Sequence, residues 1–265
     1  MKLIAPWLEM WLLCFALFGA AKLAVLGRTR GLDGGRRLVF LGLWVGMDAE
    51  AFCRRRTLPA RPEAGEWLWA TGKTLLGVVL NWGVAGRVMP FSPLLAGWVG
   101  MTGLIFCLHF GTFHLLALAW RWRGFPVTAL MDRPHRATTL AEFWSRRWNR
   151  AFHRLTHELV WQPACRRWGP KVALWLGFLG SGVVHDLIIS VPARGGWGGP
   201  TGYFLLQAAG LSLQRTVRMR RLGFAGGVRG WLWTLLFVFG PTPLLFHGPF
   251  VERVMLPFLH VLKAW

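Results

Sequence analysis

Two ionisable side chains stand side by side in an otherwise apolar stretch. Between Lys171 and Val191 the residues are mostly apolar or small, apart from His185 and Asp186 in Gly180-Ser-Gly-Val-Val-His185-Asp186. Ionisable groups are costly in lipid and normally face a cavity or a partner, so we expect a functional site here. At ~1.5 Å per residue, His185 lies roughly 21 Å from Lys171, well below the headgroups. Such dry surroundings favour the neutral imidazole that a general base needs.

A second polar candidate, Asn149, lies in the basic segment before this stretch. Thr139-Leu-Ala-Glu142 is typical of a capping box and predicts the start of a helix. Apolar residues then recur at helical spacing as far as Leu159, so we expect one amphipathic helix along the membrane surface. At ~100° per residue, Ser145 and Asn149 border its apolar stripe. There the Asn149 amide either points into a cavity or is a solvated interfacial residue.

Three arginines surround Asn149 and could bind phosphate. They are Arg146, Arg147 and Arg150. Guanidinium groups suit the phosphates of lipids and those of a coenzyme A thioester equally well. Both interpretations stay open from the residues alone.

Three further histidines also allow alternatives. His109 lies about 16 Å from Trp120 along its helix, a depth similar to that of His185. It either faces the same channel or is a buried imidazole that a backbone carbonyl satisfies. His153 and His157 have the i,i+4 spacing of metal ligands. Without an HExxH motif or a third ligand, we expect an interfacial helix face and no metal site.

The composition is typical of a membrane protein. Of 265 residues, 54% are hydrophobic, and the chain holds 18 Trp and 19 Phe. A water-soluble core of this size rarely has such a profile. The net charge is +20, but the basic residues cluster between apolar runs, which favours the positive-inside bias over nucleic-acid binding. Four scattered cysteines form no CxxC pair and indicate neither a disulfide framework nor a zinc site.

The long apolar runs predict an all-α fold, a polytopic bundle of transmembrane helices in one domain over 1–265. Five runs have about the ~20 residues that cross a bilayer. They are 3–26, 66–89, 94–120, 171–191 and 229–247, and 200–216 is marginal. The first run follows Lys2 as a signal peptide would, but it continues past Lys22 to Leu26, and we expect it to be retained.

The run from Leu38 to Cys53 is too short to cross and has basic flanks on both sides. The flanking residues are Arg28, Arg30, Arg36, Arg37, Arg54, Arg55, Arg56 and Arg61. Flanks on opposite faces of the membrane would violate the positive-inside bias, so we expect a re-entrant segment. Both flanks, and the basic segment 121–171, then lie in the cytoplasm, and the N-terminus lies outside.

Two motifs carry a family resemblance. Phe143-Trp-Ser-Arg-Arg-Trp-Asn149, with Ser181-Gly-Val-Val-His185-Asp186 thirty-six residues later, resembles the membrane-bound O-acyltransferase (MBOAT) superfamily, specifically its wax synthase branch. Three further segments resemble that branch, and the core of the likeness covers about 90–250. They are Trp44-Val-Gly-Met-Asp48, His109-Phe-Gly111 and Leu244-Leu-Phe-His247.

The resemblance implies a tunnel that acyl-CoA enters from the cytoplasm and a long-chain or other lipid-like alcohol enters from the membrane. It implies transfer of a fatty acyl group to the alcohol hydroxyl, with His185 as the catalytic histidine and Asn149 as the second active-site residue. The chemistry of both side chains fits these roles, since His185 could take the hydroxyl proton while Asn149 orients the thioester or binds the oxyanion. Asp186 could orient the imidazole. Acyl-CoA or an acyl-carrier protein is then a co-substrate, and no cofactor is expected.

Two other classes of function remain as alternatives. Intramembrane histidines also serve proton relays, so a proton-coupled transporter is one alternative, although the chain has no inverted repeat. A catalytically silent lipid-binding membrane protein is the other. The short loops favour a bacterial inner membrane, with the catalytic segment on the cytoplasmic side, over an endoplasmic reticulum location.

Overall fold

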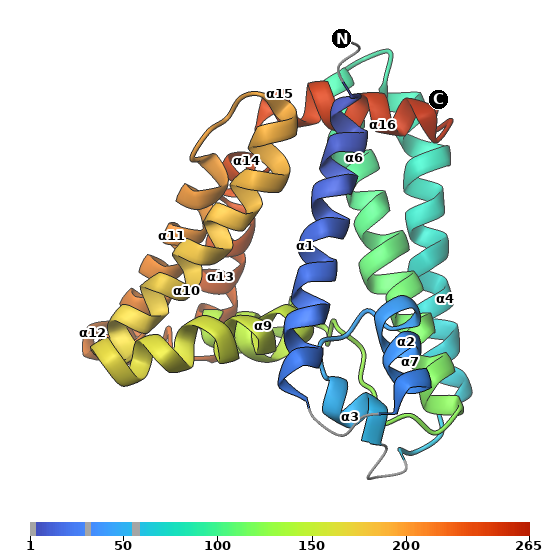
Figure 1. Cartoon of the computed structure of the whole chain (residues 1–265). Helices are drawn as coiled ribbons and strands as arrows, with labels where there is room; N and C mark the ends of the chain where they lie inside the picture. The colour runs from blue at the N-terminus through green and yellow to red at the C-terminus, as the bar shows by residue number, and fades with distance from the viewer. Residues whose placement is uncertain (1–3, 30–32, 55–58) are drawn as a thin grey trace. The chain divides into compact units, whose positions relative to one another are not determined.

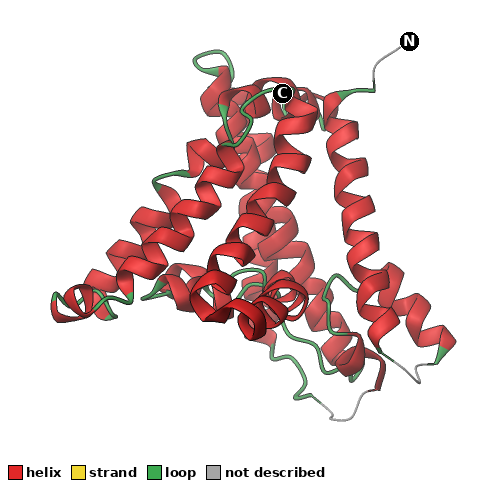
Figure 2. Ribbon diagram, turned by 60° about the vertical axis from the view of Figure 1, so that its left-hand side comes forward, coloured by secondary structure: helices red, strands yellow, loops and turns green. Residues whose placement is uncertain are grey.

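The computed structural model describes residues 4–29, 33–54 and 59–265. Every regular element in these ranges is a helix, as Figure 2 shows, which confirms the all-α class. Within them, three helical stretches are long and apolar enough to cross a membrane: Pro6–Arg28, Pro93–Trp122 and Arg150–Ala193. A bent pair, Gly227–Leu245 and Gly248–Val261 at 63°, makes a fourth if it is one span. The protein is therefore a helical membrane protein with several spans.

Two of the predicted spans differ from the helices found. The run 66–89 is helical from Ala64 to Val88, but it is less apolar than the stretches named above. The marginal run 200–216 is a helix of 16 residues, Gly199–Gln214, which is shorter than the ~20 residues a crossing needs. Some predicted flanking and terminal residues lie outside the described ranges, namely Lys2, Leu3, Arg30, Arg55 and Arg56.

The helices form two compact units. Unit 1 contains Met1–Cys14 and Asp132–Val254, and unit 2 contains Phe15–Met131 and Met255–Trp265. The first long helix, α1 (Pro6–Arg28), contributes to both. The prediction of a single domain stays a prediction beside this division.

Unit 2 is built from a run of α-helices interrupted by π-helical turns (η1, η2). Its elements after α1 are α2 (Gly34–Leu43), α3 (Ala49–Arg54), α4 (Ala64–Val78), η1 (Val79–Ala85), α5 (Gly86–Val88), α6 (Pro93–Ile105), η2 (Phe106–Thr112), α7 (Phe113–Trp122) and α16 (Leu256–Val261). Ser92 begins α6 by accepting the Leu95 N–H, and Pro93 stands where a helix needs no N–H donor. These local signals explain why the chain leaves the uncharged turn before Pro93 as a helix.

The predicted re-entrant segment doubles back on itself. The Arg36 guanidinium donates to the Cys53 carbonyl at 2.7 Å, so the two ends of the segment lie together. Lys22 of α1 forms hydrogen bonds to the backbone of the re-entrant segment. Its ammonium group donates to the carbonyls of Phe40 (3.0 Å) and Gly46 (2.6 Å), and its side chain is buried. The reversal of direction is confirmed, and insertion into the membrane stays a prediction.

Unit 1 contains the two predicted motifs. After the 3₁₀ turn η3 (Pro134–Arg136), its elements are α8 (Leu140–Glu142), η4 (Phe143–Arg147), α9 (Arg150–Thr156), η5 (His157–Trp161), α10 (Gln162–Ala193), α11 (Gly199–Gln214), α12 (Val217–Arg221), α13 (Gly227–Phe239), α14 (Thr242–Leu245), α15 (Gly248–Phe250) and η6 (Val251–Met255). In Figure 1, α10 and α11 run side by side. A Cβ at Gly182 of α10 would lie 2.7 Å from the Thr201 Cα, so this glycine permits the close approach.

A sharp bend divides α10 into two arms. Gly169 has φ 82° and ψ 169°, outside the helical region, and Pro170 then begins the second arm. In Figure 1 the first arm continues the course of α9, and the second arm turns away from it. The predicted boundary between the amphipathic segment and the span at Lys171 coincides with this bend.

The prediction of one amphipathic helix over 139–159 is wrong. Trp148 is extended and Asn149 has φ 39° and ψ 62°, so the chain leaves the helix after η4 and restarts it as α9. Asn tolerates this left-handed conformation better than most residues, because its short polar side chain can bond locally. The Asn149 side chain does so by capping α9.

Candidate active site

His185 has one ring nitrogen fixed and the other left as a base. Nδ1 lies 2.7 Å from the Ser181 carbonyl oxygen, one helical turn earlier. A carbonyl can only accept, so Nδ1 carries the proton and Nε2 carries the lone pair. The half-buried ring packs against Phe204 of α11, with 4.5 Å between ring centroids. The arrangement therefore presents Nε2 as a proton acceptor.

Asp186 does not orient this imidazole, which corrects the role expected for it. Its Oδ1 accepts from the Ser190 hydroxyl (2.8 Å) and the Gly198 N–H (3.0 Å). Its Oδ2 accepts from the Thr201 N–H (3.0 Å) and the Thr201 hydroxyl. Gly198, at the cap position of α11, has no side chain to cap with, so Asp186 takes over that task from the neighbouring helix.

Loss of the Asp186 carboxylate should therefore destabilise unit 1. We expect Asp186→Ala to cost roughly 2–4 kcal/mol, because hydrogen bonds to a charged group contribute about 1.5–3 kcal/mol each and their losses are not additive. The measurement is thermal unfolding of the purified protein in detergent. Asp132→Ala, which removes an exposed carboxylate from the same unit, is the matched control. Equal melting temperatures for the two variants would contradict this role.

A buried polar chain extends from Asp186 to His247. His247 Nδ1 accepts from the Phe250 N–H at 3.2 Å, so Nε2 carries the proton and donates to the Ser190 hydroxyl at 3.3 Å. Ser190 in turn donates to Asp186. Ser190 is fully buried and His247 nearly so. This series of hydrogen bonds joins the ends of α10, α11 and α15. Both ring nitrogens of His247 are occupied by these structural hydrogen bonds.

Asn149 is held by its carbonyl end. Its Oδ1 accepts from the Phe152 N–H at 3.2 Å and caps α9. The cap assigns the orientation of the amide, since an acceptor must face the N–H. The NH₂ group is therefore the end of Asn149 that can donate to a reacting oxygen.

Phe204 joins the two motifs. Its ring centroid lies 5.6 Å from that of Trp144, in addition to its contact with His185. Trp144 also meets Phe178 of α10 edge to face at 5.9 Å, and its indole N–H donates to the buried Gln207 at 3.3 Å. The segment before Asn149 and the segment that carries His185 thus pack together in unit 1. Sequence reasoning missed Phe204, because an aromatic residue in an apolar helix carries no signal of its own.

The three predicted phosphate-binding arginines divide into two groups. Arg147 is pinned, because its Nε donates to Glu142 Oε1 at 2.7 Å and a terminal nitrogen to the Asp132 carbonyl at 3.2 Å. A phosphate would have to displace Glu142 to bind it. Arg146 and Arg150 are exposed, and phosphate binding by them stays a prediction. These positions do not choose between the phosphates of lipids and those of coenzyme A.

Of the two hydrogen bonds of the predicted capping box, the bond to the Thr139 hydroxyl is confirmed and the bond to the Glu142 carboxylate has a different donor. The Thr139 hydroxyl accepts from the Glu142 N–H at 3.0 Å, as expected. The Glu142 carboxylate, however, accepts from the Thr138 N–H at 2.9 Å rather than from that of Thr139. Ser145, which we placed beside Asn149 on the edge of the apolar stripe as a candidate supporting residue, donates its hydroxyl to the Ala141 carbonyl at 2.6 Å within the helix. The Ser145 hydroxyl proton is therefore engaged within its own helix.

Acid should weaken the hydrogen bonds that the Glu142 carboxylate accepts from Thr138 and Arg147. Burial by itself raises the pKa of this carboxyl, but the Thr138 N–H and the Arg147 guanidinium outweigh burial and hold the pKa below its ordinary value of 4.5. A carboxyl with a lowered folded-state pKa stabilises the fold above its unfolded-state pKa and loses that contribution as pH falls through the folded-state pKa. We expect Glu142→Gln to melt earlier than the wild type at pH 7, with the difference shrinking as the pH falls below 4.5.

Thermal unfolding over a series of pH values measures this effect. Glu158→Gln is the control, because it breaks a more exposed ion pair with Arg154 (3.0 Å), and exposed pairs contribute little. A Glu142→Gln difference that stayed constant from neutral to acidic pH would show that the carboxylate charge is not what stabilises the segment.

The other predicted histidines, His109, His153 and His157, have their own surroundings. His109 belongs to η2 of unit 2, where its Nδ1 is buried without a hydrogen-bond partner among the described residues. The carbonyl partner expected for it is not found at that nitrogen, and the shared channel with His185 stays a prediction. His153 and His157 have ring centroids 6.0 Å apart, and His157 stacks on Trp161. Over the described part of the chain, no cluster of three metal-ligating residues occurs.

Comparison with known proteins places the likeness on the same segment. Residues 127–206, which include His185, Asn149 and Phe204, match the family described as membrane bound O-acyl transferase. A Simmondsia chinensis protein named long-chain-alcohol O-fatty-acyltransferase is 28% identical over 49% of this chain and 45% of its own length. An Arabidopsis thaliana protein named probable long-chain-alcohol O-fatty-acyltransferase 3 is 30% identical over 40% of this chain and 34% of its own length. The chain thus spans less than half the length of these relatives.

Proposed function

From the confirmed resemblance to the membrane-bound O-acyltransferase superfamily and its wax synthase branch, we propose that this protein transfers a fatty acyl group from acyl-CoA to the hydroxyl of a lipid-like alcohol. The observation that supports this most strongly is the state of His185. Its Nδ1–H is held by the Ser181 carbonyl, and Nε2 is left with a lone pair inside a membrane-spanning helix. This is the arrangement that a general base for a hydroxyl requires.

The proposed reaction begins with proton transfer from the alcohol. His185 Nε2 takes the hydroxyl proton as the alcohol oxygen attacks the thioester carbonyl carbon. The new C–O bond gives a tetrahedral intermediate with negative charge on the former carbonyl oxygen. The Asn149 NH₂ group donates to that oxyanion. Collapse breaks the C–S bond, the imidazolium returns the proton to the leaving thiolate, and ester and free CoA result.

Neighbouring residues support these two. Phe204 and the Ser181 carbonyl fix the ring of His185, and the Phe152 N–H fixes the amide of Asn149. Preorganisation of this kind lowers the cost of reaching the transition state. The exposed Arg146 and Arg150 would receive the phosphates of the donor. The reaction as proposed needs no cofactor.

The proposal extends to the donor and the location. Acyl-CoA is the proposed donor, with an acyl-carrier protein as the competing one, and both deliver a thioester with a phosphate group. We place the basic segment 121–171 in the cytoplasm, where either donor is available, and the protein in a bacterial inner membrane.

The test is ester synthesis by the purified full-length protein. It receives a labelled long-chain acyl-CoA, or the acyl-carrier thioester, with a panel of primary alcohols, and the lipid products are separated. Formation of a labelled ester with any alcohol supports the proposal. No ester with any donor and alcohol would refute it, and substrate flux across proteoliposomes without a thioester would instead favour a transporter.

A further inference from the structure

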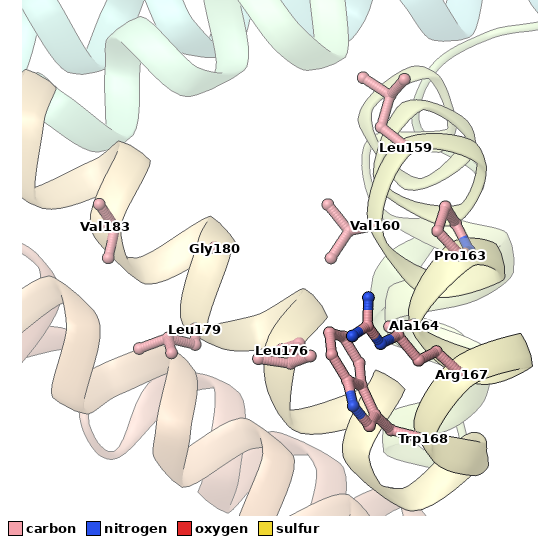
Figure 3. A pocket seen from close by; sticks show the side chains of 10 residues that line it. All are labelled: Leu159, Val160, Pro163, Ala164, Arg167, Trp168, Leu176, Leu179, Gly180 and Val183. Carbon is pink, nitrogen blue, oxygen red and sulfur yellow. The ribbon is translucent and has the colours of Figure 1, made fainter.

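An apolar groove lies in the bend of α10. Figure 3 shows it between two arms: Leu159, Val160, Pro163 and Ala164 lie on η5 and the first arm, and Leu176, Leu179, Gly180 and Val183 lie on the second. Its volume is about 600 Å³, within the ~300–1,000 Å³ typical of small-molecule sites. Arg167 and Trp168 complete the lining at the bend, and Arg167 is the one charged member.

The groove is not the reaction site. Its residues on the second arm recur at positions 176, 179, 180 and 183, one face of a helix. At ~100° per residue, His185 lies roughly 140° around the helix from Gly180. His185 faces Phe204 of α11 instead. A molecule held in the groove is therefore turned away from the His185 imidazole.

The charge at the bend indicates what the groove binds. The Arg167 guanidinium lies 5.1 Å from the Trp168 ring centroid, and no carboxylate of the described residues forms an ion pair with it. Arg166 and Lys171 add positive charge within four residues. Trp and Arg are typical of the membrane–water interface, and a guanidinium suits a phosphate. An apolar groove with a cationic end matches an acyl chain joined to an anionic phosphate.

We propose that this groove binds one acyl chain of an anionic phospholipid from the surrounding bilayer, with its phosphate on Arg167. The lipid is not consumed, because it lies on the face of α10 opposite His185. The bound acyl chain fills the angle between the two arms of α10. It would thereby limit bending of the helix at Gly169. The site is thus a lipid-binding site separate from the proposed acyl-transfer site.

Gly180 offers a direct test, because a Cβ there meets nothing within 4 Å and a side chain would extend into the groove. Gly180→Leu places an apolar side chain in the groove and so takes up part of the space for an acyl chain. Gly202→Leu is the matched control, since Gly202 is also a helical glycine of unit 1 with nothing within 4 Å and it does not line the groove. Arg167→Gln removes the charge and leaves the apolar lining in place.

Native mass spectrometry of the detergent-purified full-length protein, titrated with phosphatidylglycerol or phosphatidylcholine, measures the binding. We expect the wild type and Gly202→Leu to bind one phosphatidylglycerol at least about tenfold more tightly than phosphatidylcholine, as a charge-assisted contact would give. Gly180→Leu should bind both weakly, and Arg167→Gln should bind both equally. Unchanged phosphatidylglycerol binding in Gly180→Leu, or no preference in the wild type, would overturn the proposal. Thermal unfolding of each variant verifies that it is folded.

Discussion

His185→Asn should lower the turnover rate of ester formation by about 10²- to 10⁴-fold, the range that a general base contributes. Asparagine places an N–H close to where the imidazole Nδ1 lies, so the bond to the Ser181 carbonyl is kept while the Nε2 lone pair is lost. The variant therefore separates loss of the base from loss of structure. The measurement is the initial rate of ester formation at saturating donor and alcohol.

His135→Asn is the control for this variant. His135 belongs to the same unit and is exposed, so its replacement should leave the rate unchanged. Thermal unfolding of both variants should match the wild type. Wild-type turnover in His185→Asn would remove the imidazole from the mechanism.

Asn149→Asp should lower the rate by about 10²- to 10³-fold, the usual cost of one oxyanion donor. Aspartate keeps the oxygen that accepts the Phe152 N–H, and it tolerates the left-handed backbone at φ 39°. It lacks the NH₂ donor and brings a negative charge toward the developing oxyanion. The expected result is a folded protein with little activity.

A cap that takes no part in the proposed chemistry provides the comparison. Thr139→Ala removes the side-chain cap of α8 and should cost ~1 kcal/mol of stability. It should keep the wild-type rate below its melting temperature. If Asn149→Asp behaves like Thr139→Ala, with lower stability and full activity, the amide serves as a helix cap alone.

The sequence was most informative where one local signal decides the structure. The Thr139 hydroxyl caps a helix as its type and spacing predict. The chain bends at Gly169-Pro170, next to the predicted start of the span at Lys171, because glycine reaches positive φ and proline begins a helix readily. His185 lies in the second arm of α10, within the apolar run predicted as a span, and its depth in the membrane stays a prediction.

The sequence was least informative where distant segments decide. The left-handed Asn149 broke a periodicity that looked continuous, although asparagine is among the residues that adopt this conformation. Three of the four hydrogen bonds to Asp186 come from Gly198 and Thr201, and these donors meet it only after α11 packs on α10. No periodicity could predict that packing.

The five π-helical turns of the described residues were also beyond sequence reasoning. They include η2, which contains His109, and η4, which contains most of the Phe143–Asn149 motif. Such turns insert one residue into a helix and rotate every later side chain, and they occur often at functional sites. A face assigned from a uniform ~100° per residue is therefore unreliable beyond them.

Ester and free CoA thiol, quantified together in one reaction of the purified full-length protein with acyl-CoA and alcohol, test the central claim most directly. The account predicts equal amounts of both products from the wild type and about 10²- to 10⁴-fold less of both from His185→Asn in the same time. Thiol released without ester, or ester formed by His185→Asn at the wild-type rate, would contradict it.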